Sequence, residues 1–321
     1  MLSRRTLVAS ITLMPFVEPV AAAQWPQRPV RIVYPYAAGS TGDATARLIA
    51  RWLGDALGQP FIVENRVAAN GIVATEAVAR SAPDGYTLLW AVTPQIAISP
   101  AMTKVPYDPI KDFIPISAIS TNRFALIVNA KMPVQTVAEF VDYVRARPHD
   151  FAYAEGGAGS ITHLAMVLFL NRAGLTATNV SYKGTAPALT DVVAGHLPAM
   201  FSLFGDGLSQ MESGLVRMLA VSSAQRSAQA PNVPTIAEAG FPGFAVTSWW
   251  GLLAPAGTPK PIVDRIAAEI AQATKDPKIV KQLTNFGVDP VGSSPAEFTA
   301  MISSDIALWA EAVKLTGLQT P

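Results

Sequence analysis

The sequence contains no cysteine and only three histidines in 321 residues. The lack of cysteine excludes disulfide bonds, thiolate catalysis, cysteine-ligated zinc and a lipoprotein anchor. The histidines, His149, His163 and His196, do not fall at the spacing of metal ligands. We therefore expect neither a metal site nor a cofactor.

Charged residues are also scarce, at 15% of the chain, and the formal net charge is +1. There is no basic stripe and no acidic tail, so neither nucleic acid nor an anionic membrane surface is expected as a partner. Hydrophobic residues make up 50% of the chain, which argues against disorder and, at this length, allows two folded domains. No coiled-coil pattern is present, and a monomer is expected.

Residues 1–23 have the pattern of a cleaved signal peptide. Arg4 and Arg5 precede a short apolar run, Leu7–Phe16, and three alanines at 21–23 form a cleavage site before Gln24. The run is too short to cross a bilayer, and no later segment is long and apolar enough. The paired arginines leave twin-arginine export open beside the favoured Sec route. We expect a periplasmic protein.

From residue 24 the sequence alternates between strand and helix patterns. Strand patterns at Val30–Tyr34 and Tyr86–Val92 flank an amphipathic helix at Thr41–Leu57, and a second series begins at Phe124–Val128. This alternation predicts an α/β fold with mostly parallel strands.

The end of the chain breaks this alternation. Two amphipathic helices follow Trp249–Pro255 with no clear strand between them, which is typical of a segment that returns to cover an earlier domain. We therefore predict two α/β lobes: a discontinuous lobe 1, residues 24–122 and 254–321, and an inserted lobe 2, residues 123–253.

Each predicted lobe has a strand that ends in a small-residue loop before a helix. In lobe 1 this loop is Tyr34–Asp43, with hydroxyls at Ser40 and Thr41, and in lobe 2 it is Glu155–His163. Small residues let a ligand approach the backbone, and free N–H groups at a helix start favour an anion. Two such loops suit an anion held between two lobes, although an ordinary strand-to-helix turn explains each loop taken alone.

Sequence templates for catalysis are missing. There is no G-x-S-x-G elbow and no G-x-x-x-x-G-K-[ST] phosphate loop, and the segment Gly157–Gly159 lacks the third glycine of a dinucleotide fingerprint. Ser160 and His163 are close in sequence, but one helical turn does not make a nucleophile–base pair. We expect a binding protein and not an enzyme, with a periplasmic hydrolase acting through Ser160 as the enzymatic alternative.

Seven blocks of the sequence resemble the Bug family, the extracytoplasmic solute-binding proteins of the tripartite tricarboxylate transporter system. The match runs from about Trp25 to the last helix. The blocks are Pro35–Arg47, Val63–Arg66, Ala82–Leu88, Tyr107–Phe113, Tyr182–Asp191, Val233–Gly240 and Trp249–Pro259.

This resemblance implies the type II periplasmic-binding-protein fold, in which two α/β lobes joined by two chain crossings enclose a ligand cleft. It also implies capture of a small organic acid, a dicarboxylate or an aromatic carboxylate, by hinge closure, and delivery to the membrane permease subunits of the transporter. Two further alternatives stay open: an amino acid or uncharged amide as ligand, and a sensor that presents its closed form to a signalling receptor.

The resemblance also implies which residues contact the ligand. The matching positions in the two loops and along the cleft edges are Tyr36, Ala37, Ala38, Ser40, Thr41, Asp43, Thr93, Gly159, Ser160, His163, Lys183 and Gly184.

Three positions depart from the family pattern. The first loop has separated glycines, at Gly39 and Gly42, Ser202 stands where many relatives carry aspartate, and Glu155 stands where a small residue is usual. We include Ser202 and Glu155 among the residues expected to contact the ligand. A carboxylate at position 155 that points into the cleft repels a simple diacid and favours a hydroxyl, amide or ammonium group. The candidates for an aromatic wall of the cleft are Tyr36, Phe204, Trp249 and Trp250.

Overall fold

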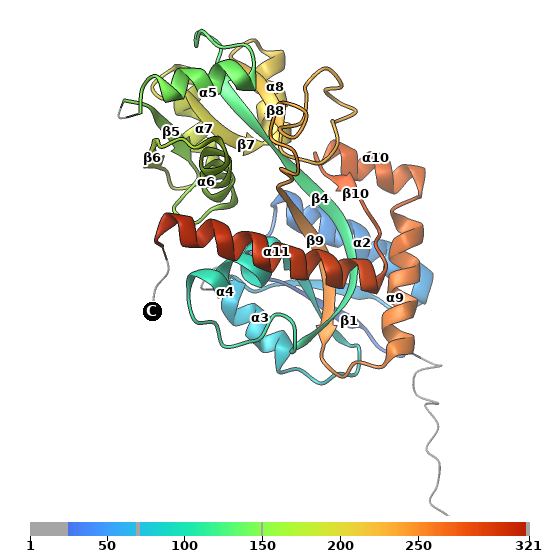
Figure 1. Cartoon of the computed structure of the whole chain (residues 1–321). Helices are drawn as coiled ribbons and strands as arrows, with labels where there is room; N and C mark the ends of the chain where they lie inside the picture. Colours follow the sequence, from blue (N-terminus) through green and yellow to red (C-terminus); the bar gives the residue numbers. More distant parts are fainter. Residues whose placement is uncertain (1–24, 69–70, 149, 319–321) are drawn as a thin grey trace, which may run out of the picture.

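The computed structural model describes residues 25–68, 71–148 and 150–318 (Figure 1). Its strands form one sheet in the order β2-β1-β3-β9-β4-β7-β5-β6, with β8 and β10 also paired to β4. The strands are β1 (Val30–Tyr34), β2 (Phe61–Asn65), β3 (Thr87–Val92), β4 (Phe113–Asn129), β5 (Ala152–Glu155), β6 (Thr178–Ser181), β7 (Ala199–Leu203), β8 (Val216–Val221), β9 (Thr247–Pro255) and β10 (Asp289–Pro290).

Helices cover both halves of this sheet. They are α2 (Thr41–Leu57), α3 (Ile72–Ala79), the π-helix η2 (Pro94–Ile98), α4 (Ser99–Met102), α5 (Val137–Arg145), α6 (Ile161–Ala173), α7 (Thr185–Ala194), α8 (Phe204–Glu212), α9 (Lys260–Ala273), α10 (Pro277–Asn285) and α11 (Pro295–Thr316).

One long strand, β4, joins the two halves of the molecule. Its residues 113–123 pair antiparallel with β9, and residues 124–129 pair antiparallel with β7 and β8. On one side β1 pairs in parallel with β2 and β3, and on the other β5 pairs in parallel with β6 and β7. We call the half around β1 lobe 1 and the half around β5 lobe 2. The predicted α/β architecture of two lobes is confirmed. The prediction of mostly parallel strands is wrong, because β4 and β9 pair antiparallel with all their neighbours and the sheet is mixed.

The element predictions differ from the structure mainly near this crossing. The strand predicted at Phe124–Val128 is the second half of β4, because Pro115 and two register shifts interrupt the alternating pattern of the first half. The C-terminal part has three helices and the short strand β10, where the sequence pattern predicted two helices. The amphipathic helix predicted at Thr41–Leu57 is confirmed with the same bounds.

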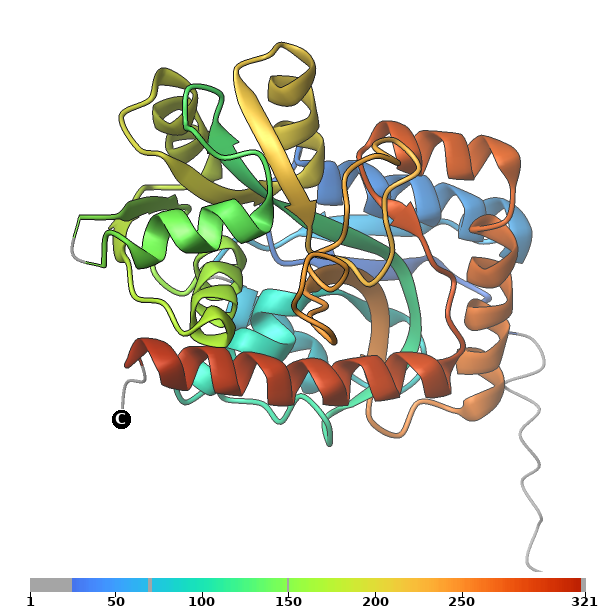
Figure 2. The same ribbon diagram turned by 45° about the horizontal axis from the view of Figure 1, so that its top comes forward.

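Helix α11 connects the cores of both lobes (Figure 2). It begins beside α9 with a capping box, in which Ser294 accepts from the backbone N–H of Glu297 and the Glu297 carboxylate accepts from that of Ser294. Phe298, near its start, packs in a buried cluster of lobe 1. Trp309, near its end, packs in the buried cluster that includes Phe169 of lobe 2. The helix therefore supports the crossing strand β4 on the face nearest the viewer in Figures 1 and 2.

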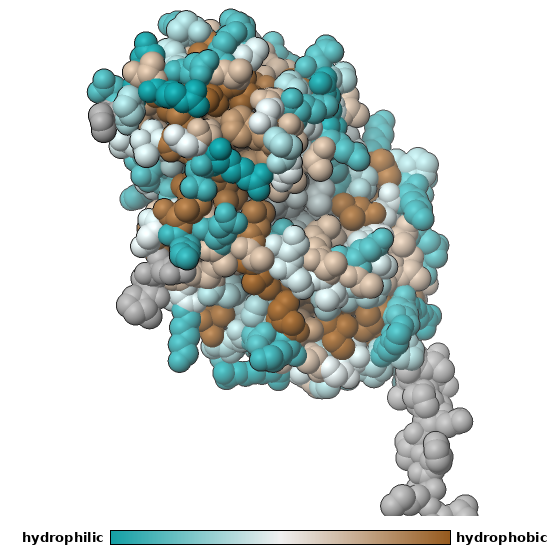
Figure 3. Space-filling view, in the orientation of Figure 1, coloured by the Kyte–Doolittle hydropathy of each residue, from teal (hydrophilic) through white to brown (hydrophobic). Residues whose placement is uncertain are grey.

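The surface has no continuous apolar band on the face that carries α11. Figure 3 shows apolar side chains there as separate patches between hydrophilic ones. Among the described residues, none of the helices combines the length and the apolar composition that a membrane crossing requires.

Candidate ligand-binding cleft

A cleft with a volume of about 690 Å³ lies where the two lobes meet. This volume is typical of small-molecule sites. The residues that line it come from strand ends, helix starts and the crossing strands: Tyr34, Tyr36, Val92, Pro94, Asn122, Phe124, Gly156, Ser160, Ile161, Thr162, Gly184, Thr185, Leu203, Ser248 and Trp250.

A smaller cavity of about 130 Å³ adjoins the cleft beside the crossing strands. Asn122, Leu203 and Trp250 line both spaces. The first residue of α2, Thr41, also faces the small cavity, together with Arg123 from β4.

The loop between β1 and α2 forms the lobe 1 side of the cleft. Ser40 caps α2, because its Oγ accepts from the backbone N–H of Asp43 at 3.2 Å. The same oxygen lies 3.0 Å from the hydroxyl of Tyr34, so the last residue of β1 is tied to the first turn of the helix. Gly42 is required for this approach, because a Cβ there would lie 2.3 Å from the Tyr34 hydroxyl.

The carboxylate of Asp43 holds this loop in place. It accepts from the backbone N–H of Gly39 at 3.0 Å, from Asn65 Nδ2 at 2.9 Å and from Arg47 through two bonds of 3.0 Å. Asn65 Nδ2 also donates to the carbonyl of Tyr36 at 3.1 Å. Burial alone would raise the pKa of Asp43. The hydrogen bonds together lower this pKa by more than burial raises it, so the pKa of Asp43 lies below its usual value. Asp43 thus positions the loop that carries Tyr36.

The Gly-rich loop of lobe 2 is held by its own side chains. The N–H of Gly156 donates to Thr162 Oγ1 at 3.2 Å, that of Gly157 to Glu155 Oε2 at 2.5 Å, and that of Gly159 to His163 Nδ1 at 3.1 Å. These three amides are therefore engaged inside the protein. The groups that this loop presents to the cleft are the hydroxyls of Ser160 and Thr162, which lie 3.1 Å apart, and the start of α6.

Glu155 and His163 lie behind this loop. Their exposed fractions are 0% and 5%, and neither belongs to the lining of the cleft. The second oxygen of Glu155, Oε1, is buried without a hydrogen-bond partner in the described part of the chain. Burial lowers the pKa of His163, and the negative charge of Glu155 raises it by less, so the imidazole is neutral at neutral pH.

The other predicted site residues differ in where they lie relative to the cleft. Tyr36, Ser160 and Gly184 line the cleft, and Thr41 lines the adjoining cavity. Thr93 and Ser202 are buried, and Lys183 is exposed. The residues that complete the first and second loops without lining the cleft are Ala37, Ala38, Ser40, Asp43 and Gly159.

Thr93 and Ser202 contribute to packing around the cleft. Thr93 Oγ1 accepts from the backbone N–H of Trp249 at 2.9 Å and so joins the end of β3 to β9. Ser202 lies under α8, where a Cβ on Gly207 would approach its Oγ to 2.6 Å.

Sequence reasoning missed several lining residues on the crossing strands. Asn122 and Phe124 on β4 face the cleft, as does Ser248 on β9 beside Trp250, the one of these four that was an aromatic candidate. Each pair is two residues apart, which is the spacing of one strand face. That alternation was the available signal, but it identifies a face and not which face meets the cleft.

The four aromatic candidates have different positions. Tyr36 and Trp250 line the cleft, and Phe204 lines the adjoining cavity. Trp249 faces the opposite side of β9, where its Nε1 donates to Asp305 of α11 at 2.7 Å and its ring packs 4.9 Å from that of Phe298.

Comparison with known proteins identifies the family. The family described as "Tripartite tricarboxylate transporter family receptor" matches residues 45–318, which is most of the chain. The chain belongs to this receptor family. The resemblance to Bug proteins is also confirmed, because Protein BugT of Bordetella pertussis (strain Tohama I) is 35% identical over 301 residues, 93% of this chain and 92% of BugT.

Solved structures agree with this membership. An R. palustris protein with adipate is 35% identical, with a TM-score of 0.76 over 91% of this chain and 98% of that chain. A TctC solute binding protein from Polaromonas, without ligand, is 28% identical, with a TM-score of 0.83 over 90% of this chain and 99% of that chain.

Family membership confirms one expectation for this receptor and supports two others at the level of the family. Members are solute-binding proteins, so the prediction of a binding protein and not an enzyme is confirmed. The family is periplasmic, binds small carboxylates and works with tripartite tricarboxylate permeases. The predicted signal peptide, residues 1–23, lies outside the described residues.

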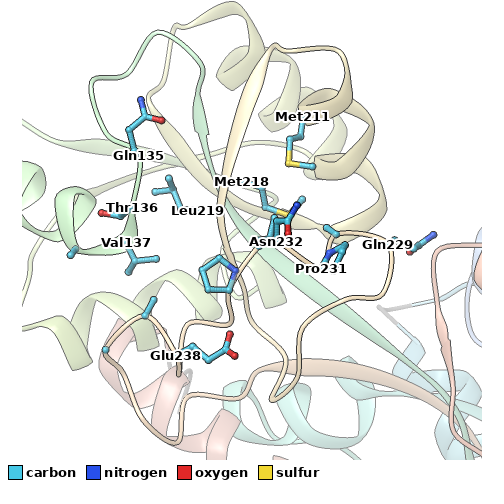
Figure 4. A pocket seen from close by; sticks show the side chains of 16 residues that line it. Gln135, Thr136, Val137, Met211, Met218, Leu219, Gln229, Pro231, Asn232 and Glu238 are labelled. Atoms are coloured by element: carbon cyan, nitrogen blue, oxygen red, sulfur yellow. The ribbon is translucent and has the colours of Figure 1, made fainter.

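A second hollow of the receptor is larger than this cleft. A pocket of about 890 Å³ lies on the outside of lobe 2, between α5, β8 and the segment 229–240 (Figure 4). Its polar groups are largely engaged: Glu238 accepts from Arg226 and from the backbone of Thr235, and Thr136 caps α5. Only lobe 2 contributes to this pocket, so a ligand there would not bring the lobes together.

Proposed function

We propose that this receptor binds a small carboxylate in the cleft between its lobes, closes around it, and delivers it to permease subunits of a tripartite tricarboxylate transporter. The observation that carries the proposal is the convergence of helix starts on one space. Helices α6 and α7 begin in the lining of the cleft, at Ser160 and Gly184, and α2 begins in the adjoining cavity, at Thr41.

Helix starts suit a carboxylate for a physical reason. The first N–H groups of a helix have no partner within it, and the helix dipole places partial positive charge there. An anion at this position accepts hydrogen bonds from backbone groups without a basic side chain. The hydroxyls of Ser160 and Thr162 add donors at the same place.

The connection between the lobes supports closure. The lobes are joined by crossing strands near Asn122 and Thr247, which are suitable positions for a hinge. We keep the predicted lobe boundaries, 24–122 with 254–321 and 123–253, as part of this proposal.

The position of Glu155 bears on the amino acid and amide alternatives. Its carboxylate lies behind the Gly-rich loop and is bonded to the N–H of Gly157. The charge that would have favoured an ammonium group is thus absent from the lining, and a carboxylate remains the ligand that the cleft supports best.

The test compares two N-cap variants in the mature protein, from Gln24 onward. Ser160→Ala removes a cap and a hydroxyl of the cleft, and Thr136→Ala removes the cap of α5, far from the cleft. Each should lower the free energy of unfolding by about 1 kcal/mol. Only Ser160→Ala should weaken carboxylate binding, measured by calorimetry, by about fivefold or more. Equal affinities in both variants would refute the assigned role of Ser160.

A further inference from the structure

The cavity of about 130 Å³ beside the cleft contains residues of both lobes. Thr41 lines it from the start of α2 in lobe 1, and Asp206 lines it from the first turn of α8 in lobe 2. Asn122, Leu203 and Trp250 line the cavity and the cleft together. One end of a ligand that is held in the cleft therefore lies next to this cavity.

Arg123 supplies the one cation among the described residues that line the two spaces. On one side its guanidinium is paired, because Nε donates to Asp289 at 2.8 Å and Nη2 contacts the same carboxylate oxygen. Its remaining nitrogen, Nη1, is buried and has no hydrogen-bond partner within the described chain. The guanidinium carbon lies 5.5 Å from the centre of the Phe204 ring, which also lines the cavity. One nitrogen of Arg123 is thus left without an acceptor beside this space.

Asn122 provides a second buried polar group at the same place. It is only 8% exposed, and it lines both the cleft and the cavity. Its main chain lies opposite Ser248 in the pairing of β4 with β9, but its side-chain amide forms no hydrogen bond with the rest of the described residues. An amide nitrogen donates two hydrogen bonds, so Asn122 adds donors next to that of Arg123.

The unpartnered groups of Arg123 and Asn122 favour an oxygen that accepts hydrogen bonds. A buried donor without an acceptor is unfavourable, and most buried polar groups in proteins are hydrogen-bonded. A ligand oxygen would supply the acceptor, and a hydrogen bond from a guanidinium is among the stronger kinds. The start of α2 favours the same type of group, because the helix dipole places partial positive charge there.

We propose that this cavity is a second subsite for the ligand, in which Arg123 and Asn122 bind an oxygen at the end opposite to the first carboxylate. The oxygen belongs to a hydroxyl or to a carboxylate, and Arg123 is the residue that selects ligands carrying it. This inference rests on the proposed function, since it requires that the first carboxylate lies at the starts of α6 and α7.

Calorimetry with matched acids tests the inference. Butanoate, pentanoate and hexanoate are each compared with the acid that has a hydroxyl at its far end and with the diacid of the same length. In the wild type, at the length that fits, a terminal oxygen should strengthen binding at least about tenfold. In Arg123→Met, which removes the donors and keeps an unbranched side chain, the gain should fall below about twofold.

The control for this variant is Arg217→Met. Arg217 is also partly buried, and its guanidinium donates to the carbonyls of Met132 and Val134, outside both linings. The gain from a terminal oxygen should be the same in Arg217→Met as in the wild type. A loss of that gain in both variants would mean that it reflects stability and not contact with Arg123, and the inference would be wrong.

The outcomes separate the subsite from the proposed function. A gain that disappears only in Arg123→Met supports the subsite, and the larger of the two gains identifies the hydroxyl or the carboxylate. If Arg123→Met weakened the monoacids as much as their partners, Arg123 would serve the architecture and the inference would fail. Monoacids that bind without any gain from a terminal oxygen would overturn the inference and leave the proposed function standing. Failure of every acid to bind would overturn both.

A second variant leaves Arg123 in place and changes its charge balance. Asp289→Asn keeps an oxygen that accepts from Arg123 but removes the negative charge that neutralises it. The affinity for the diacid relative to the hydroxy acid should therefore rise at least about threefold. The control is Asp264→Asn, at a similarly exposed aspartate that pairs with Lys260 on α9. An unchanged ratio in Asp289→Asn would place the terminal group away from Arg123 and contradict the inference.

Discussion

At the scale of single residues, the carboxylates of Asp43 and Glu155 form hydrogen bonds within the protein, and the residues that line the cleft are neutral. Asp43 orders the loop that carries Tyr36, and Glu155 engages an amide of the Gly-rich loop. Both positions were expected to contact ligand. Their type and place in the loops were predictable from the sequence, but the direction of each side chain was not. Asp43 is held by Asn65 from β2, and Glu155 turns back to the N–H of Gly157 in its own loop.

Asp43→Asn should lower the free energy of unfolding at pH 7 by about 1–3 kcal/mol, because several charge-assisted hydrogen bonds weaken. The folded-state pKa of Asp43 is lowered, so its stabilisation is full above the unfolded value of about 3.9 and is lost as pH falls through the folded pKa. The difference in the free energy of unfolding between wild type and Asp43→Asn, measured by urea unfolding, should therefore narrow below pH 4.

The control for this variant is Asp55→Asn, on the exposed side of the same helix. It should follow the wild-type curve within about 0.5 kcal/mol at each pH. A gap for Asp43→Asn that stays constant down to pH 2 would show that its carboxylate does not provide the stabilisation.

The contribution of Asp305 to stability should depend on pH in the opposite direction to that of Asp43. Burial raises its pKa to about 6, against the lowering effect of the hydrogen bond from Trp249. A raised folded-state pKa means that stability relative to Asp305→Asn is greatest below about pH 4 and falls as pH rises through 6. Unfolding midpoints at pH 4.5, 6 and 7.5 should show this decline. If the unfolding midpoints of wild type and Asp305→Asn changed in parallel with pH, this prediction would be wrong.

At the scale of elements, local patterns predicted the regular units and missed the crossing. The bounds of α2 followed from amphipathic spacing. The first half of β4 and the short strand β10 did not, because their pairing is set by distant segments. Lining residues such as Asn122 and Ser248 were missed for the same reason.

Helix α11 provides a test of how the lobes are connected. Trp309 is fully buried between α11 and lobe 2, so Trp309→Ala should destabilise the protein by about 3–5 kcal/mol. Leu315→Ala, on an exposed part of the same helix, should cost less than about 1 kcal/mol. The midpoints of urea unfolding measure both. Similar losses for the two variants would argue against a buried anchor at Trp309.

At the scale of the whole molecule, ligand binding should bring the lobes together. The lack of cysteine lets engineered pairs carry spin labels without background. Arg51→Cys with Lys183→Cys joins exposed sites on the two lobes, and Lys183→Cys with Ser213→Cys lies within lobe 2. A saturating carboxylate ligand should shorten the first distance and leave the second unchanged. An unchanged first distance would refute closure.

In the proposed closure, the placement of α11 would determine how far each wall of the site travels. This helix is anchored in both cores and contacts Trp249, on the face of β9 opposite to the cleft, so the pivot of the motion would lie on that face. Side chains on the crossing strands, such as Trp250 and Asn122, would shift little and form a preset floor. Those on the loops of each lobe, such as Tyr36 and Gly184, would travel farther. Ligand chemistry would thus be sampled first at the floor, and ligand length last, at the loops.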